Sequence, residues 1–96
     1  MILHTLNAPP SSSAFRECLS LLQPGDALLL MGDGVYAALR DTSSCSALVA
    51  SGAEIYALED DAKAAGVLDR IDHATALDMD GFVALSERFE RQLGWY

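Results

Sequence analysis

The chain has 96 residues, enough for one domain with a modest core, and 51% of them are hydrophobic, which excludes a disordered segment. Fourteen acidic residues against six basic ones give a net charge of −8, so we expect neither direct nucleic-acid binding nor docking on an anionic membrane. Two cysteines do not make a disulfide framework, and we recognise no signal peptide or membrane span. These features predict one cytoplasmic domain over residues 1–96, with reduced thiols.

The first half of the chain alternates predicted strands and helices. Residues 2–6 are predicted to form a strand that ends before a proline pair, and the serines that follow offer N-caps for a helix over residues 14–23. The continuous apolar run 27–31 is typical of a parallel strand that is buried on both faces. A short helix is expected over residues 34–40, and a helical turn over residues 47–51.

The second half continues the alternation. We expect a third strand over residues 54–58 and then a helix that Asp60 or Asp61 caps and Gly66 ends. A short fourth strand is expected over residues 74–77. The third strand and the fourth are thus separated by a helix, as a parallel sheet requires.

The last predicted helix runs over residues 81–93 with Asp80 as its cap, and its apolar stripe at helical spacing consists of Phe82, Leu85, Phe89 and Leu93. Strands that alternate with helices predict an α/β fold. We expect three α/β/α layers around a mostly parallel sheet of four to five strands. Ligands of such folds bind at the carboxyl ends of the strands, which here carry acidic or neutral residues.

A glycine turn between an apolar strand and a helix is also the local pattern of a phosphate-binding loop. Such a loop needs free backbone amides, a nearby Lys or Arg and no carboxylate facing the anion. The turn Gly32-Asp33-Gly34 instead has an aspartate in its middle, and the nearest cation, Arg40, is well down the next helix. We therefore interpret the turn as a tight corner in which Asp33 caps the helix, and we expect no nucleotide or other cofactor.

The nucleophilic and metal-ligating residues are few. Cys18 lies on the apolar stripe of the first helix, away from Arg16, so we expect a buried thiol. Cys45 lies among serines with no base nearby, so we expect an exposed thiol of ordinary reactivity, although a helix start there would favour the thiolate. His4 and His73 have no cysteine or carboxylate at ligand spacing, which argues against a metal site, and His4 is expected to be a satisfied histidine within the sheet.

The chain ends on an aromatic pair, Trp95-Tyr96. Chain ends are usually polar and poorly ordered. The pair therefore either folds back on the last helix or docks on another chain, where Trp and Tyr are favoured anchors. Both interpretations are open from the residues alone.

A series of short segments follows in a fixed order along the chain: residues 2–6, 25–30, 33–38 and 56–58, then Asp60-Asp61, Ala65-Gly66, residues 80–83 and Trp95. In this order and with these gaps the segments resemble the DsrH/TusB family. The resemblance covers essentially the whole chain, and the series carries it rather than any single motif.

The resemblance implies the α/β/α fold of the DsrE, DsrF and DsrH proteins and a cytoplasmic heterohexamer with two copies each of three related subunits. It implies a non-catalytic subunit of a sulfurtransferase complex, with TusC/DsrF-like and TusD/DsrE-like partners. That complex receives persulfide sulfur from TusA-type carriers and passes it to a TusE-like acceptor, for 2-thiolation of the wobble uridine of tRNA. In sulfur-oxidising bacteria, relatives act in dissimilatory sulfur trafficking, and both branches share this pattern.

Within that family the persulfide-carrying cysteine belongs mainly to the TusD/DsrE subunit, although Cys18 falls close to a cysteine of some DsrH-type members. Cys18 is therefore a candidate secondary sulfur acceptor. The glycine corner and the chain end are available for subunit contacts, and the candidates are Asp33, Gly34, Tyr36, Trp95 and Tyr96. Two alternatives stay open. Cys18 or Cys45 is an obligatory persulfide carrier, with Cys18 the candidate for dissimilatory sulfur oxidation, or the chain is a small-ligand-binding domain that uses the strand ends.

Overall fold

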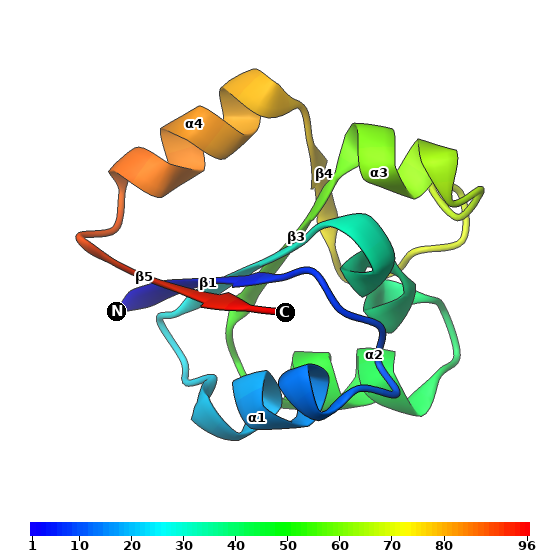
Figure 1. Cartoon of the computed structure of the whole chain (residues 1–96), viewed down its shortest axis with the longest axis horizontal. Helices are drawn as coiled ribbons and strands as arrows, with labels where there is room; N and C mark the ends of the chain where they lie inside the picture. The colour runs from blue at the N-terminus through cyan, green and yellow to red at the C-terminus, as the bar shows by residue number, and fades with distance from the viewer.

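The computed structural model describes all 96 residues and contains one sheet of five parallel strands in the order β4-β3-β2-β1-β5 (Figure 1). The strands are β1 (Ile2–Leu6), β2 (Ala27–Leu30), β3 (Glu54–Leu58), β4 (Thr75–Leu77) and β5 (Arg91–Trp95). The prediction of an α/β fold around a parallel sheet of four to five strands is confirmed.

Helices cover both faces of this sheet. Helices α1 (Ser13–Leu21) and α2 (Ser43–Ala50) lie on one face, and α4 (Met79–Glu87) lies on the other (Figure 1). The 3₁₀ helix η1 (Gly32–Ala38) follows the carboxyl end of β2, α3 (Glu59–Ala64) follows that of β3, and the two pack together. None of the helices has the length and apolar character needed to cross a bilayer.

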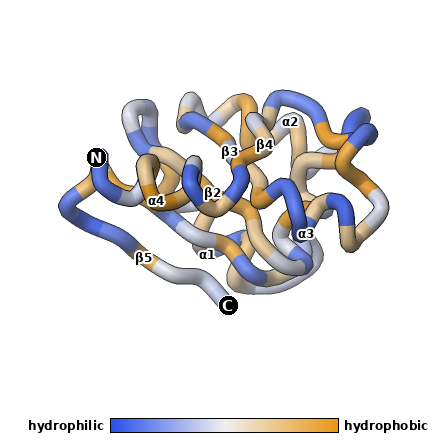
Figure 2. Tube along the Cα trace, turned by 90° about the horizontal axis from the view of Figure 1, so that it is seen from above, coloured by the Kyte–Doolittle hydropathy of each residue, from blue (hydrophilic) through white to orange (hydrophobic).

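Strand β2 is buried at every position, as its apolar run predicts. Because side chains alternate across a strand, Leu28 and Leu30 belong to the larger core cluster with α1 and α2. Ala27 and Leu29 point the other way, into a smaller cluster with α4. The four residues of β2 therefore contribute to both cores. By contrast, the segment that leads into β5 at the edge of the sheet is hydrophilic (Figure 2).

The helix starts show which caps the sequence predicts well. The hydroxyl of Ser12 accepts a hydrogen bond from the amide of Phe15 at 3.1 Å, so the predicted serine cap of α1 is confirmed. Helix α2 is longer than the predicted turn over residues 47–51, because Thr42 caps it from a position five residues earlier. Helix α4 begins after Asp78, whose carboxylate accepts from the amide of Gly81 at 2.8 Å, and not after the predicted cap Asp80.

The end of the chain differs most from the prediction. The helix expected over residues 81–93 is wrong, since α4 ends at Glu87 and the chain then forms β5. Phe82, Leu85 and Phe89 do face the smaller core, but Leu93 lies on the strand and is 39% exposed. Pairing with β1 decides this segment, and no local periodicity records a partner some ninety residues away.

A buried chain of hydrogen bonds ties the two ends of the protein to its middle. The indole Nε1 of Trp95 donates to Nδ1 of His4 at 3.1 Å, and Nε2 of His4 lies 3.2 Å from Oδ2 of Asp26. Because an indole N–H can only donate, Nδ1 accepts and the imidazole proton is assigned to Nε2. His4 has no exposed surface, so the expectation of a satisfied histidine within the sheet is confirmed.

Asp26 holds this chain of bonds in place. Its carboxylate also accepts from the backbone amides of Ile2 at 2.9 Å and of Gln23 at 3.1 Å. Burial disfavours the charged carboxylate, but the hydrogen bonds from Ile2, His4 and Gln23 outweigh it, so the pKa of Asp26 lies below its ordinary value. One side chain thus fixes the start of β1, the end of α1 and the start of β2.

We expect the substitution Asp26→Asn to lower the free energy of unfolding by about 2 kcal/mol at neutral pH. An amide has one acceptor oxygen, so its NH₂ group would face a donor that the carboxylate now accepts from. A lowered native pKa stabilises the fold above the ordinary aspartate range, and this contribution is lost as pH falls through the native pKa. The difference between the two proteins in urea unfolding should therefore be largest near neutral pH and shrink in acid.

Asp69→Asn is the matched control, because it removes the same charge from an exposed side chain that makes no hydrogen bond of its own. It should leave the unfolding midpoint within error. An equal loss in both variants would mean that net charge, not the buried network, explains the effect.

Candidate functional site

The corner after β2 is built on close backbone contact. Gly32 has a φ of +53°, a conformation that favours glycine. A Cβ atom at Gly34 would collide with the carbonyl oxygen of Leu6, so this position also requires glycine. The two glycines therefore let β2 turn tightly across the end of β1.

A carboxylate from α3 occupies this corner. The amide of Gly32 donates to Oδ2 of Asp61 at 2.8 Å. Asp33 is exposed and makes no cap hydrogen bond, so its predicted capping role is wrong, and Met31 stands at the N-cap of η1. The sequence places Asp61 only as a possible cap of its own helix, because nothing local shows that η1 and α3 meet.

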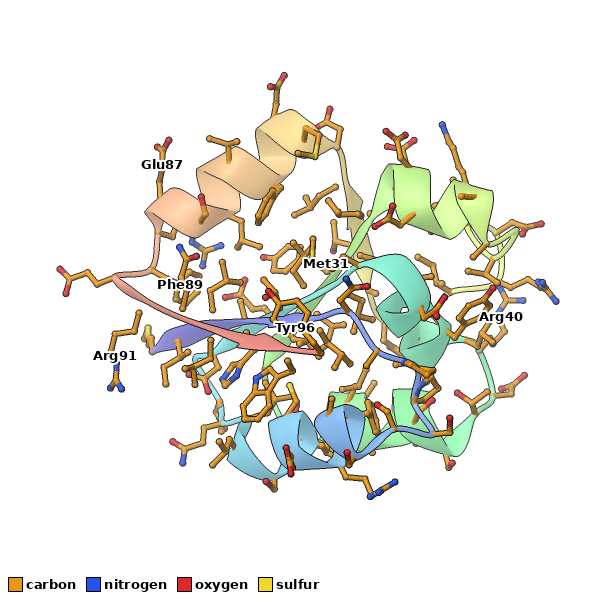
Figure 3. All side chains as sticks on the ribbon, viewed as in Figure 1. Met31, Arg40, Glu87, Phe89, Arg91 and Tyr96 are labelled. Atoms are coloured by element: carbon orange, nitrogen blue, oxygen red, sulfur yellow. The ribbon has the colours of Figure 1, made fainter.

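The hydrogen bond between Gly32 and Asp61 argues against phosphate binding at this corner. A phosphate at the corner would need the amide that Asp61 already uses, and it would face the negative charge of that side chain. Arg40, the cation nearest to the turn along the chain, does not compensate, since its guanidinium donates to the carbonyl of Asp69 at 3.2 Å (Figure 3). The geometry supports a structural corner, in agreement with the interpretation of the turn.

The thiol of Cys18 lies inside the protein. Cys18 is 1% exposed within the larger core, and Arg16, two residues earlier in α1, is exposed and donates to the carbonyl of Ser11. Burial in apolar surroundings raises the pKa of the Cys18 thiol to about 12. The buried position agrees with the expectation from the helical stripe.

Cys45 is also buried, at 5% exposed, so the expectation of an exposed thiol is wrong. Helix α2 begins earlier than predicted and turns Cys45 toward the backbone carbonyl of Asp72, 3.5 Å from its Sγ. A helix start lowers a thiol pKa in general. Here burial, followed by the nearby charges of Asp72 and Asp41, raises the pKa of Cys45 instead.

The largest hollow is a cavity of about 550 Å³ at the carboxyl ends of the central strands. It lies between the β1–α1 loop, η1 and the start of α2. Apolar side chains share its lining with hydroxyl groups, and no charged residue lines it: the hydroxyl groups belong to Ser11, Tyr36, Thr42, Ser43 and Ser44. No group of three or more His, Cys, Asp or Glu residues lies close enough to hold a metal ion.

Comparison with known proteins identifies the family of this chain. Residues 8–92 match the family described as DsrH like protein. The chain belongs to the DsrH-like family. It is 37% identical over 95 residues to a protein named TusB from Pectobacterium parmentieri and 34% identical to one from Photorhabdus laumondii. Each alignment covers 98% of this chain and the whole of the relative.

Solved structures share the DsrH-like fold at lower identity. The crystal structure of the ychN protein from E. coli superposes with a TM-score of 0.76 at 18% identity, over 98% of this chain and 97% of that one. The solution structure of protein Tm0979 from Thermotoga maritima gives 0.71 at 21% identity, over 94% and 95%. Identity this low establishes the shared fold alone.

The five interface candidates of this DsrH-like chain do not form one continuous group. Asp33 is exposed beside Gly34, which is buried, while Tyr36 is half-buried and lines the large cavity. Trp95 is half-buried because it folds back onto His4, not onto the last helix. Tyr96 is 83% exposed at the opposite end of β5 from Arg91 (Figure 3). Among the candidates, Asp33 and Tyr96 present the most accessible side chains.

We expect Asp61→Ala to destabilise the DsrH-like chain by about 1 kcal/mol, because the amide of Gly32 loses its charged acceptor. Asp60→Ala is the matched control, since it changes the adjacent exposed carboxylate, which makes no hydrogen bond. Urea unfolding of both variants measures the difference. Equal stability of the two would show that the bond across the corner contributes nothing.

Both thiols should resist modification in the native chain. With a pKa of about 12, roughly one Cys18 thiol in ten thousand is ionised at mildly alkaline pH. We expect iodoacetamide to label Cys18 and Cys45 at least about 100-fold more slowly than in the urea-unfolded chain, as read by mass spectrometry. The variants Cys18→Ser and Cys45→Ser assign the residual rate, and rapid native labelling of Cys18 would contradict its burial.

Proposed function

We propose that this chain is a subunit of a sulfur relay complex of the TusBCD/DsrEFH type, and that its role there is structural rather than sulfur-carrying. The full-length match to the DsrH-like family and to proteins named TusB is the observation that carries this proposal. Its partners would be two related subunits of TusC/DsrF and TusD/DsrE type, in a heterohexamer that passes persulfide sulfur to a TusE-like acceptor. The sulfur would serve 2-thiolation of the wobble uridine of tRNA.

The chemistry of the chain supports a subunit without a sulfur-carrying thiol. Sulfur transfer needs a thiolate that can reach a persulfide on another protein. Cys18 is 1% exposed and Cys45 is 5% exposed, and the pKa of each thiol is raised. In this conformation neither thiol meets the requirement, so the proposal assigns the transfer to a cysteine of a partner.

The charge of the chain supports a protein partner rather than direct contact with tRNA. A net charge of −8 repels a phosphate backbone. A relay subunit does not need that contact, because sulfur moves between proteins before it reaches the nucleic acid. The same charge is no obstacle to assembly with other small α/β domains.

Purification of the tagged chain from its own cells tests the assembly. We expect a native mass several times that of the monomer and, in the same complex, two further small subunits of related sequence in equal amounts. Size-exclusion chromatography with mass spectrometry of the bound proteins measures both. A monomer or homodimer without such partners would overturn the proposed assembly and would leave the family match as evidence of the fold alone.

Sulfur loading of the same complex tests the structural role. After incubation with a cysteine desulfurase and a TusA-type carrier, we expect a gain of about 32 Da on a partner cysteine and none on this chain. A complex with Cys18→Ser should assemble and pass sulfur at the normal rate within about twofold, because the thiol takes no part. An adduct on Cys18, with transfer abolished by the substitution, would establish the alternative of an obligatory carrier.

A further inference from the structure

The C-terminal strand β5 is the most exposed strand of the sheet. It is an edge strand bonded only to β1, and four of its five residues are exposed. Phe89 is buried just before it, while Arg91 points outward at its start (Figure 3). Within β5 only Trp95 packs against the larger core. Segments with so few buried side chains open at a lower free energy than the core.

The side-chain anchor of β5 is a contact with a titratable ring. The indole of Trp95 stacks on His4 with 6.3 Å between ring centroids and 19° between planes, and its N–H donates to Nδ1 of His4 at 3.1 Å. This bond requires Nδ1 to carry no proton. The Trp95 side chain of β5 therefore bonds to the neutral form of His4, in addition to the backbone pairing of β5 with β1.

Protonation of His4 at Nδ1 breaks the hydrogen bond from Trp95 but keeps the bond to Asp26. Once Nδ1 carries a proton, it faces the N–H of Trp95 donor to donor, and the hydrogen bond is lost. The bond from Nε2 to Asp26, at 3.2 Å, remains and becomes an ion pair. One proton thus weakens the contact of His4 with β5 and strengthens its contact with Asp26.

The surroundings of His4 contain one charged group that faces the ring. Asp26 comes from the turn between α1 and β2, and the hydrogen bonds that lower its pKa keep it ionised in mild acid. On the same face, the titratable side chain that α1 buries is the neutral thiol of Cys18, and β2 contributes Leu28 and Leu30. Strand β5 contributes the uncharged Trp95.

We propose that His4 and Trp95 form a proton-controlled latch on the C-terminal strand: neutral His4 holds β5 against the sheet, and protonated His4 releases it. The buried members of both hydrophobic clusters lie outside β5, and Trp95 packs against the larger cluster as a partly buried neighbour. Release would uncover the outer edge of β1. The latch goes beyond the proposed sulfur relay role and does not require it.

Trp95 is the only tryptophan, so its fluorescence reports directly on the latch in the full-length chain. When the pH is lowered from about 8 to about 5, we expect the emission maximum of Trp95 to move to longer wavelength. Far-UV circular dichroism should stay nearly constant. By hydrogen exchange, the protection factors of residues 91–95, corrected for the intrinsic pH dependence, should fall at least about tenfold, while those of β2 and β3 stay unchanged.

His4→Gln is the matched variant, because its amide offers one donor and one acceptor but does not titrate in this range. It should abolish both the spectral step and the pH dependence of exchange in β5. If His4→Gln does not fold, Trp95→Phe keeps an aromatic ring without the N–H, and its β5 protection should be low and independent of pH. The latch is overturned if the wild-type protein shows no wavelength shift and no faster exchange in β5, even where the intensity falls.

Discussion

The structure depends on a hydrogen-bond chain with one direction, from an indole that can only donate, through a histidine, to a carboxylate that can only accept. Trp95, His4 and Asp26 are apart in sequence: His4 lies in β1, Trp95 in β5, and Asp26 in the turn just before β2. Because Asp26 also accepts from the amides of Ile2 and Gln23, the same carboxylate sets the register of β1 against β2 and ends α1. An apolar substitute at any of the three positions would leave a buried polar partner unsatisfied.

Hydrogen bonds within the chain also determine which polar groups are accessible at the carboxyl ends of the strands. In many α/β proteins the corner after a central strand keeps its amides free for a ligand. Here the amide of Gly32 is bonded to Asp61, which brings η1 and α3 together and closes the corner. The carboxyl edge of the sheet is therefore organised by contacts within the chain. Asp33 and Tyr96 remain exposed at this edge, where the cavity lined by hydroxyl groups also lies.

The elements that the sequence predicts well are those with local causes. Strand β2 follows from an apolar run and the start of α1 follows from Ser12, since burial on both faces and helix capping are written in adjacent residues. The alternation of these elements is enough to predict a parallel α/β sheet.

The larger errors have a different cause, which is contact between distant segments. Strand β5 forms because β1 offers an edge and His4 offers an acceptor, whereas residues 81–93 alone have a helical stripe. Cys45 is buried because Asp72, twenty-seven positions later, closes over it, so its serine-rich neighbours mislead. The bond from Gly32 to Asp61 is likewise invisible before the fold brings them together.

The acidic character of the chain links these observations to sulfur chemistry. A reactive thiol or persulfide is an anion, and cations or helix starts stabilise it. Cys45 lies at a helix start, yet burial, followed by the charges of Asp72 and Asp41, raises its thiol pKa. Cys18 lies in the apolar core, where burial raises its thiol pKa. A chain with net charge −8 is a poor host for a second anion. In the sulfur relay that we propose, the anionic sulfur would therefore be carried by a partner, and this chain would help to shape the complex around it.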